Sequence, residues 1–535
     1  MKKYLKTENN RPGWACLVDG EWNVYFAGSQ TVAQTILGRL KASPHDEPPQ
    51  FILSELANLP IRWGFIAANK QSLFAATDRI RSFPVFYTDQ KDSYLVSNSA
   101  RALYSCVQSP SLNIGGLLDF RMAGYTTGHE TLISEIHQLQ AGELLFCAKK
   151  QVRQIVRYYR YLPHPTMESA ASLLGQLQEN TESNFKEIVK EAHGRQIVVP
   201  LSSGLDSRLI LGLLKELKYK NVFCFSYGPR GNHEARIARQ VACHAGYPWN
   251  FVPINHALNR KAFLSKEREA YWQFSDNLCA IPSMQDILPI QILLNEKKIR
   301  QDAIMINGQT GDFISGGHIP PSLISKNSSS EFKNYIFHKH YALRKSLCTL
   351  SNRLAINDRL EAFLAGMEQP AKGKTEMAGL YESWEWQERQ CKYVVNGQRI
   401  YDWLGLEWRL PLWETRYLDF WAKVPWEMKL KQRLYKEYLQ KSNYGGLFQK
   451  IGRAGWPWFG WSNAVPPTGK VLECIWGTEV KDSFYSFARY WGYYGPQYGF
   501  YGIRKFYTEC KDIRNVIALY VDTWIQENKN LLLAK

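Results

Sequence analysis

The chain has 535 residues, of which 45% are hydrophobic and 21% charged, so it is long enough to form two or more domains with large cores. It contains no apolar run of about 18 residues or more, which excludes an ordinary membrane-spanning helix. The net charge of +17 is spread along the chain without a basic block. This spread favours anionic small molecules as ligands, or a net charge without a specific role. RNA is a weaker alternative as a binding partner.

The ten cysteines are scattered and form no C-x-x-C pair, which argues against a zinc site and against a disulfide framework. The first ten residues contain no apolar stretch of the signal-peptide type. We therefore expect a cytoplasmic protein. Short alternating segments between residues 13 and 159 predict a β-rich N-terminal domain. Cys16 lies in one of these segments, and we expect it to be buried.

The most informative stretch runs from Val198 to Arg208 and reads as a buried strand, a loop of small residues and a helix over about 207–217. Such loops let backbone N–H groups approach a phosphate. Asp206 would repel that phosphate unless a cation lay between them, so it implies Mg²⁺. A simple Ser/Gly turn is the alternative. The chain has no G-x-x-x-x-G-K-[ST] pattern, so this is not a Walker A loop.

Further strands are predicted over 221–228, 249–254 and 303–307, and a helix over 233–246. Alternating strands and helices predict a parallel sheet that binds ligands at the carboxyl ends of its strands. The loop over 308–318 follows one of these strands and contains Asp312. Two carboxylates at two strand ends can hold Mg²⁺ against phosphates, although a Gly/Asp turn is the alternative for this loop.

Residues 202–207 are similar to the S-G-G-x-D-S loop of the PP-loop ATP pyrophosphatases, with Ser203 at the position of the first glycine. This loop, the strand end 226–228, the loop 308–317 and the run 406–414 follow one another in an order that resembles the synthetase domain of the asparagine synthetase B family. Residues 73–87 and 136–159 are similar to the glutaminase domain of the same family, and 136–159 to its two closing strands.

This resemblance implies two domains. Residues 1–163 would form an α+β, Ntn-like αββα sandwich of the glutaminase type. Residues 164–535 would form an α/β PP-loop synthetase domain, of the adenine nucleotide α-hydrolase-like kind, with a helical C-terminal part that includes 406–414. The family's glutaminase uses a cysteine directly after the initiator methionine, and Lys2 stands there in this chain. We therefore expect the N-terminal domain to lack glutaminase activity.

The resemblance also implies ATP and Mg²⁺ as cofactors. The residues that it assigns to the nucleotide are Ser202, Ser203, Gly204, Leu205, Asp206, Ser207, Ser226, Tyr227, Gly228 and Gly311. The metal ligands would be Asp206 and Asp312. Gln309, which replaces a glutamate of the family, and Lys450 are the catalytic candidates. Lys450 is the best positional match to the family's phosphate-facing lysine, and an exposed surface lysine is the alternative.

The implied reaction adenylates a carboxylate, releases pyrophosphate and transfers the acyl group to ammonia or an amine. We expect the carboxylate to belong to a small molecule or sugar, in particular to a uronic acid of a surface polysaccharide. Asparagine synthesis, lactam or isopeptide ring closure, RNA modification and an inactive scaffold are alternatives. Ammonia would come from a separate glutaminase or from free ammonium. Nucleic acid is not an expected partner, and the sequence leaves a homodimer open.

The C-terminal region is dense in aromatic residues, over 455–461 and again over 485–501. Aromatic rings stack on sugars, but they also fill local cores, and packing is the better-founded interpretation of this stretch.

Overall fold

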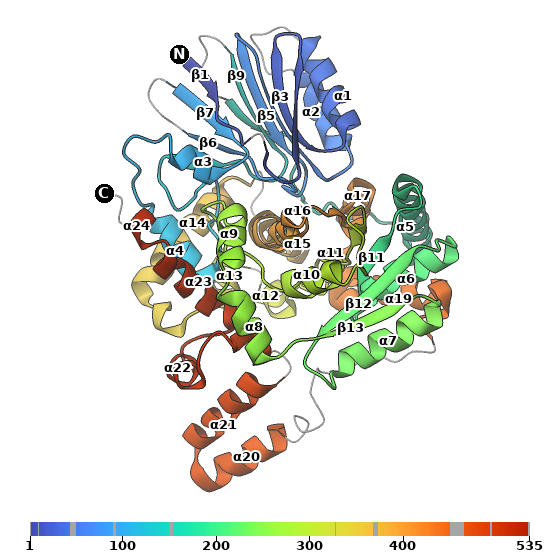
Figure 1. Ribbon diagram of the computed structural model, residues 1–535, viewed down its shortest axis with the longest axis vertical. Helices are drawn as coiled ribbons and strands as arrows, with labels where there is room; N and C mark the ends of the chain where they lie inside the picture. The colour runs from blue at the N-terminus through green and yellow to red at the C-terminus, as the bar shows by residue number, and fades with distance from the viewer. Residues whose placement is uncertain are drawn as a thin grey trace.

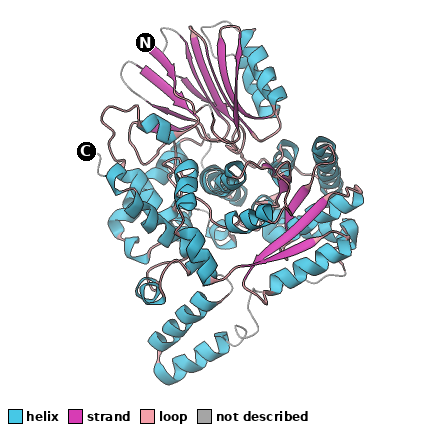
Figure 2. Ribbon diagram, viewed as in Figure 1, coloured by secondary structure: helices cyan, strands magenta, loops and turns pink. Residues whose placement is uncertain are grey.

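Strands of the described residues form three sheets, which Figures 1 and 2 show with the helices around them. The computed structural model describes residues 2–8, 10–42, 50–88, 93–148, 154–326, 328–367, 373–449, 465–492 and 495–532.

The N-terminal part contains two of the sheets. The four-stranded sheet has the order β1 (Lys2–Leu5), β7 (Ser93–Ser97), β6 (Phe86–Thr88) and β8 (Ile136–Gln138). The six-stranded sheet has the order β10 (Gln154–Arg157), β9 (Glu143–Ala148), β5 (Ser72–Thr77), β4 (Trp63–Ala68), β3 (Trp22–Gly28) and β2 (Trp14–Asp19).

Alternating side chains of the six-stranded sheet pack into two separate hydrophobic cores, because successive side chains of a strand point to opposite faces. Phe65 and Phe74 pack towards α1 (Gln30–Lys41) and α2 (Gln50–Asn58), whereas Ile66 and Ala75 pack towards the four-stranded sheet. The short helix α3 (Ala100–Tyr104) packs against β6, β7 and β8. Helices thus pack on the outer faces of the two sheets, as expected for an α+β fold. Three strands, β8, β9 and β10, occupy the stretch where two were predicted.

The third sheet is parallel and lies in the second half of the molecule. Its order is β13 (Trp249–Pro253), β12 (Val222–Gly228), β11 (Ile197–Pro200), β14 (Ile304–Ile306) and β15 (Glu407–Arg409). Three helices accompany it: α5 (Ala170–Ala192), α6 (Leu205–Glu216) and α7 (His233–Ala245). The central strand β11 is an uninterrupted apolar run because a parallel sheet is covered on both faces.

The strands and helices predicted between residues 198 and 307 are present at the expected places, and the predicted helices after residue 414 are α17 (Thr415–Lys423), α18 (Trp426–Lys429) and α19 (Arg433–Ser442). One prediction was wrong, because the run that begins at Leu406 is not wholly helical. Its residues Glu407–Arg409 pair with β14 and form the edge strand β15.

Helices make up most of the rest of the chain. They are α4 (Ile114–Ala123), α8 (His256–Phe263), α9 (Lys266–Ser275), α10 (Ile287–Asn295), α11 (Gly311–Ile314), α12 (Pro321–Lys326), α13 (Ser329–His340), α14 (Leu350–Ala365), α15 (Lys374–Trp384), α16 (Arg399–Trp403), α20 (Val465–Trp476), α21 (Thr478–Trp491), α22 (Ile503–Glu509), α23 (Val516–Glu527) and α24 (Lys529–Leu532). A π-helix, η2 (Glu385–Val394), continues α15, and a 3₁₀ turn, η8 (Gly495–Tyr498), precedes α22. The α20–α21 hairpin projects from the body in Figure 1.

Some of the aromatic residues near the C-terminus form a packed core in the part that the structure describes, whereas Phe487 and Trp491 are exposed. Tyr490, Tyr498 and Phe500 are buried, and the rings of Phe263 and Phe500 stack with centroids 3.9 Å apart. The aromatic stretch 455–461 lies outside the described residues.

Buried charges fasten the N-terminal part to the rest of the chain. Asp276 accepts hydrogen bonds from Arg101 at 3.0 and 2.5 Å and from the Trp524 indole at 2.8 Å. Arg11 donates to the Phe274 carbonyl at 2.6 Å and to Asn277 at 3.0 Å. These contacts join segments more than 170 residues apart, so the N-terminal sheets are tied to the helices beside the parallel sheet.

The ten cysteines are free. Cys16 was predicted to be buried, and this prediction was wrong: it lies on β2, the edge strand of the six-stranded sheet, and is exposed. No helix in the described ranges is long and apolar enough to cross a membrane.

Candidate functional site

The loop between β11 and α6 is held together by its own hydroxyl groups. The Ser202 N–H donates to Ser207 Oγ at 3.2 Å, and the Gly204 N–H donates to Ser202 Oγ at 3.1 Å. A Cβ atom on Gly204 would meet only Ser202 Oγ, at 3.1 Å, so the loop is open on this side. The first turn of α6, whose N–H groups have no helical acceptors, is suited to bind an anion there.

The loop that follows β14 contacts this first loop directly. A Cβ atom on Gly308 would lie 2.6 Å from Asp206 Cβ, and one on Gly311 would lie 2.5 Å from the Asp206 carboxylate. Both positions therefore need glycine. Asp206 Oδ1 also accepts a hydrogen bond of 2.8 Å from the Tyr435 hydroxyl on α19. The two loops that were predicted from separate stretches of sequence thus meet at Asp206.

Asp312 is positioned by a chain of ionic groups. Its Oδ2 lies 3.0 Å from His318 Nε2, and His318 Nδ1 lies 2.6 Å from Glu385 Oε1 on η2. Burial alone would lower the pKa of His318, but the hydrogen bonds to the two carboxylates raise it to about 9. His318 is therefore the cation between two anions, and it fixes the direction in which Asp312 points.

The carboxylates of Asp206 and Asp312 are suited to a metal ion that binds as a complex with a nucleotide. Within the described residues, no three His, Cys, Asp or Glu side chains gather into a complete metal site. Asp206 and Asp312 provide two carboxylates from contacting loops. Mg²⁺ typically takes one or two protein carboxylates and completes its shell with water and substrate phosphates, so this donor set fits Mg²⁺ bound together with ATP.

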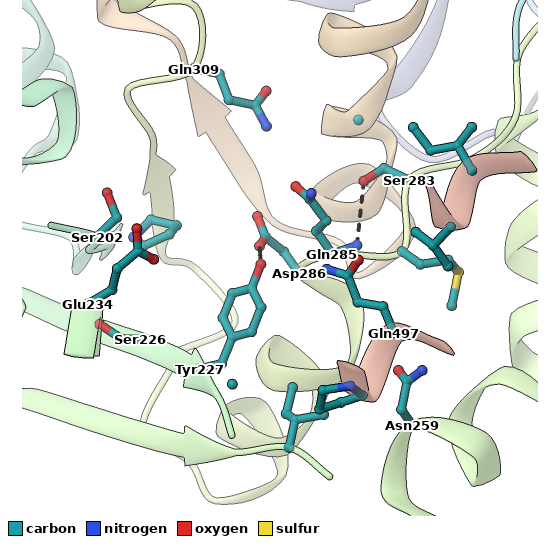
Figure 3. A pocket seen from close by; sticks show the side chains of 18 of the residues that line it. Ser202, Ser226, Tyr227, Glu234, Asn259, Ser283, Gln285, Asp286, Gln309 and Gln497 are labelled. Carbon is teal, nitrogen blue, oxygen red and sulfur yellow. Dashed lines mark hydrogen bonds between the residues drawn. The ribbon is translucent and has the colours of Figure 1, made fainter. Parts of the chain in front are cut away.

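A cavity of about 600 Å³ opens beside these loops, a size typical of small-molecule sites. Ser202 lines it from the first loop, Gln309 from the second, and Ser226, Tyr227 and Gly228 from the end of β12. Figure 3 shows Ser202, Ser226 and Glu234 on one side of the Tyr227–Asp286 pair. Ser283, Gln285, Asn259 and Gln497 lie on the other side.

A buried chain of polar groups connects the middle of this cavity with Gln309. Tyr227 and Tyr401 donate to Asp286 at 2.7 and 2.9 Å. The Asn307 amide donates to Tyr401 at 3.2 Å and to Gln398 at 3.0 Å, and Gln398 donates in turn to the Gln309 side-chain carbonyl. Burial raises the pKa of Asp286, although the two tyrosine hydroxyls oppose this effect. Gln309 and Tyr227 are therefore held by one network.

The sequence comparison agrees with this geometry, because residues 183–449 match the family model described as asparagine synthase. These residues form an asparagine synthase domain. The domain contains all five strands of the parallel sheet and both loops at Asp206. The match supports, in general terms, an ATP-dependent amidating ligase of the asparagine synthetase type.

Other comparisons add little. A search of curated proteins finds no match. A solved structure of glutamine phosphoribosylpyrophosphate amidotransferase from B. subtilis, complexed with ADP and GMP, aligns at 12% identity and a TM-score of 0.14 over 55% of this chain and 57% of that chain. A structure described as the allosteric regulatory enzyme of purine biosynthesis aligns at 12% identity, a TM-score of 0.15 and the same coverage. The chain thus spans less than two thirds of either protein.

Most of the predicted site residues of the asparagine synthase domain lie at or beside the cavity. Ser203, Gly204, Leu205, Asp206 and Ser207 continue from Ser202 through the first turn of α6, and Gly311 packs against Asp206. Asp312 follows Gly311, and its side chain is 58% exposed. Lys450, the predicted catalytic lysine, lies outside the described residues.

Several residues of the site were missed in the sequence. Glu234 accepts a hydrogen bond of 3.4 Å from Ser203 Oγ, Tyr435 binds Asp206, and Asp286 and Arg389 line the cavity. Their separation from the two loops along the chain left no local pattern to find them. Only Glu234 could have been found from a sequence pattern, because it lies in the first turn of the helix predicted after the Ser226–Gly228 strand end.

Proposed function

We propose that this chain is an AMP-forming ligase that activates a carboxylate as its adenylate and converts it to an amide, with the carboxyl group of a sugar uronic acid as substrate. The observation that supports the proposal best is the convergence of the Ser202 loop, the β12 end and Gln309 on one cavity, with Asp206 between the two loops. A site with these three components can hold phosphates, a nucleoside and an acid together.

In the first step, a carboxylate oxygen forms a bond to the α-phosphorus of ATP, and the bond to pyrophosphate breaks. Ser202, Gly204 and Ser207 would hold the departing pyrophosphate, because their loop presents N–H and hydroxyl groups at a helix N-terminus. Asp206 and Asp312 would hold Mg²⁺, which neutralises charge on the phosphates. Lys450 would add a positive charge facing the phosphates.

In the second step, the nitrogen of ammonia or an amine attacks the activated carbonyl carbon, loses a proton and displaces AMP. The adenine would lie against Ser226, Tyr227 and Gly228, at the carboxyl end of β12. Gln309 lines the same cavity, and a carboxamide cannot serve as a general base. Gln309 would therefore orient the substrate and would not accept its proton.

The N-terminal part, which we delimit at residue 163, would contribute no glutaminase. Cys16 is embedded in β2, where its backbone pairs with Tyr25, so as the chain stands its α-nitrogen is a peptide nitrogen and no base. We propose that nitrogen comes from free ammonium or from a separate glutaminase. Release of glutamate from glutamine by the purified protein, at a rate that ATP and acid increase, would contradict this part of the proposal.

The proposal is tested by ATP–pyrophosphate exchange in the presence of Mg²⁺ with L-aspartate, L-glutamate, D-glucuronate and UDP-glucuronate. We expect exchange that depends on a uronic acid and that is lost in Asp206→Ala. Exchange with aspartate alone would overturn the uronic acid assignment. Absence of ATP binding by the wild-type protein in calorimetry would overturn the ligase assignment.

A further inference from the structure

One end of the cavity is completed by residues beyond the asparagine synthase domain. The domain match ends at residue 449, yet η8 and α23 supply Pro496, Gln497, Asn515, Val516, Ile517 and Tyr520 to the cavity wall. Figure 3 shows Gln497 beside Gln285, across the Tyr227–Asp286 pair from Ser202. The cavity thus has a phosphate-loop end inside the domain and a second end that the C-terminal segment completes.

This second end is rich in carboxamide and hydroxyl groups. Asn259, Ser283, Gln285, Gln497 and Asn515 all line the cavity. The Asn259 Nδ2 group is buried and has no hydrogen-bond partner among the described residues. A carboxamide both donates and accepts hydrogen bonds, so several of them match a ligand with several hydroxyl groups. The unpartnered Asn259 amide can therefore donate a hydrogen bond to a ligand in the cavity.

Arg389 adds one cation to the lining of the cavity. It lies on the π-helix η2, and Tyr393, Val394 and Gly397 follow it along the same cavity wall. π-Helices are rare and often occur at functional sites, because their wider turn changes which side chains share a face. The Arg389 side chain is 34% exposed, so a ligand in the cavity can reach it.

The Arg389 guanidinium retains donors for an anion. Within the described part of the chain, its one side-chain hydrogen bond goes to Glu385 Oε1 and is 3.5 Å long. Glu385 has closer partners, since His318 lies at 2.6 Å, and Tyr381 and Gln390 also donate to it. A guanidinium has five N–H donors and binds carboxylates in a two-pronged geometry.

We propose that this second end of the cavity binds the acid substrate, that Arg389 pairs with its carboxylate, and that the carboxamides select acids with several hydroxyl groups. The inference rests on the proposed ligase function and deepens it by assigning substrate specificity to named residues. Free aspartate has no hydroxyl group and offers these carboxamides fewer hydrogen-bonding groups than a uronic acid does.

The test compares Arg389→Gln with Arg416→Gln, a control at an exposed arginine paired with Glu187 on the surface. ATP–pyrophosphate exchange gives KM for D-glucuronate and UDP-glucuronate, and calorimetry gives Kd for MgATP. We expect Arg389→Gln to raise KM for the acid about 10- to 100-fold, as loss of a charged hydrogen bond does, with Kd for MgATP unchanged. Arg389→Lys should fall between Arg389→Gln and the wild type, and Arg416→Gln should match the wild type.

An unchanged KM for the acid in Arg389→Gln would overturn the proposal. An equal rise in Kd for MgATP would also overturn it, because Arg389 would then bind phosphate or act through Asp312. If the proposed ligase function itself is wrong, the wild-type protein would show no exchange with any acid. That result differs from either outcome that would overturn the role of Arg389. If Arg389→Gln does not fold, as judged by circular dichroism, Gln497→Ala on the η8 turn replaces it.

Gln497→Ala should raise KM for hydroxylated acids several-fold and leave Kd for MgATP unchanged, since a neutral hydrogen bond contributes about 1 kcal/mol. The same KM in Gln497→Ala and in the wild type, for both uronic acid probes, would remove the C-terminal segment from substrate recognition.

Discussion

Two loops at the carboxyl ends of neighbouring strands in one parallel sheet present the two candidate metal ligands. The two carboxylates are held in place in different ways. Asp206 lies against the backbone of the second loop, because Gly308 and Gly311 approach so closely that no side chain fits between the loops, and it also accepts a hydrogen bond from the Tyr435 hydroxyl. Asp312 is more exposed, and its orientation depends on the side chains of His318 and Glu385. Backbone contact fixes the first carboxylate, and an ionic chain fixes the second.

This difference predicts which changes each carboxylate tolerates. Asp206 should be insensitive to the loss of a single neighbouring side chain, because the two glycines hold it in place. Asp312 should be sensitive, since removal of His318 breaks its link to the buried Glu385. Partner groups that orient a metal ligand typically contribute a factor of about 10–100 to affinity or activity.

The largest effect should come from removing Asp206 itself. Asp206→Ala deletes the carboxylate at the meeting point of the loops, and exchange activity should fall by about 10²–10³-fold or more, the scale seen when a group that stabilises transition-state charge is lost. Rates at several Mg²⁺ concentrations measure it, and Ser54→Ala, at an exposed serine of α2, is the control. Activity within a few-fold of the wild type would show that Asp206 is no metal ligand.

The next effect separates the two modes of support. His318→Gln should lower exchange by about 10–100-fold and raise the Mg²⁺ concentration needed for half-maximal rate. Tyr435→Phe, which removes the 2.8 Å hydrogen bond from the tyrosine hydroxyl to Asp206, should change both quantities less than tenfold. If Tyr435→Phe loses more exchange activity than His318→Gln, with the same fraction of folded protein in both samples, the two carboxylates are not held in the different ways described.

A smaller effect is expected from crowding the contact between the loops. Gly311→Ala places a Cβ atom 2.5 Å from the Asp206 carboxylate, so one of the loops must shift. Such overpacking is unfavourable by about 1–3 kcal/mol, and the displaced carboxylate should lower exchange roughly tenfold. Gly175→Ala, at a helical glycine of α5 with nothing within 4 Å, is the matched control and should keep full activity. Equal thermal midpoints and rates in both variants would show that the loops do not meet as described.

The strand, loop and helix around Ser202 could be predicted from sequence because their features are local. A strand, small residues and a helix follow one another in the chain over 197–216, and the loop with Asp312 repeats this arrangement. The far end of the cavity could not be predicted in this way. Arg389, Asp286 and Gln497 come from a π-helix, a loop and a C-terminal turn, and only tertiary packing brings them together.

Two other failures have the same origin. Cys16 lies in a strand as expected, but an alternating pattern does not show that the strand is at the edge of its sheet, where side chains remain exposed. The strand Glu407–Arg409 is only three residues long, and its identity depends on pairing with β14, about a hundred residues earlier. Pairing of this kind leaves no periodic signal in so short a segment.

The smallest effect on activity should come from the outer edge of the sheet that presents both loops. Glu407 on β15 lies 2.5 Å from Arg409, 2.6 Å from Arg195 and 3.0 Å from Arg62 of the N-terminal part. Burial alone would raise the pKa of Glu407, but the three arginines lower it to about 2. Because the folded-state pKa is below the unfolded value, the stabilisation is complete above about pH 4.5 and is lost as the pH falls towards 2.

Glu407→Gln should therefore reduce the free energy of unfolding by about 2–3 kcal/mol at pH 7. The difference in thermal midpoint from the wild type should shrink between pH 4.5 and pH 3, whereas exchange activity of the folded variant should change little. Glu191→Gln, at an exposed partner of Arg409, should lower stability by no more than about 0.5 kcal/mol. A midpoint difference that stays constant or grows on acidification would show that the arginines do not stabilise the ionised Glu407, and that the sheet edge is held by packing alone.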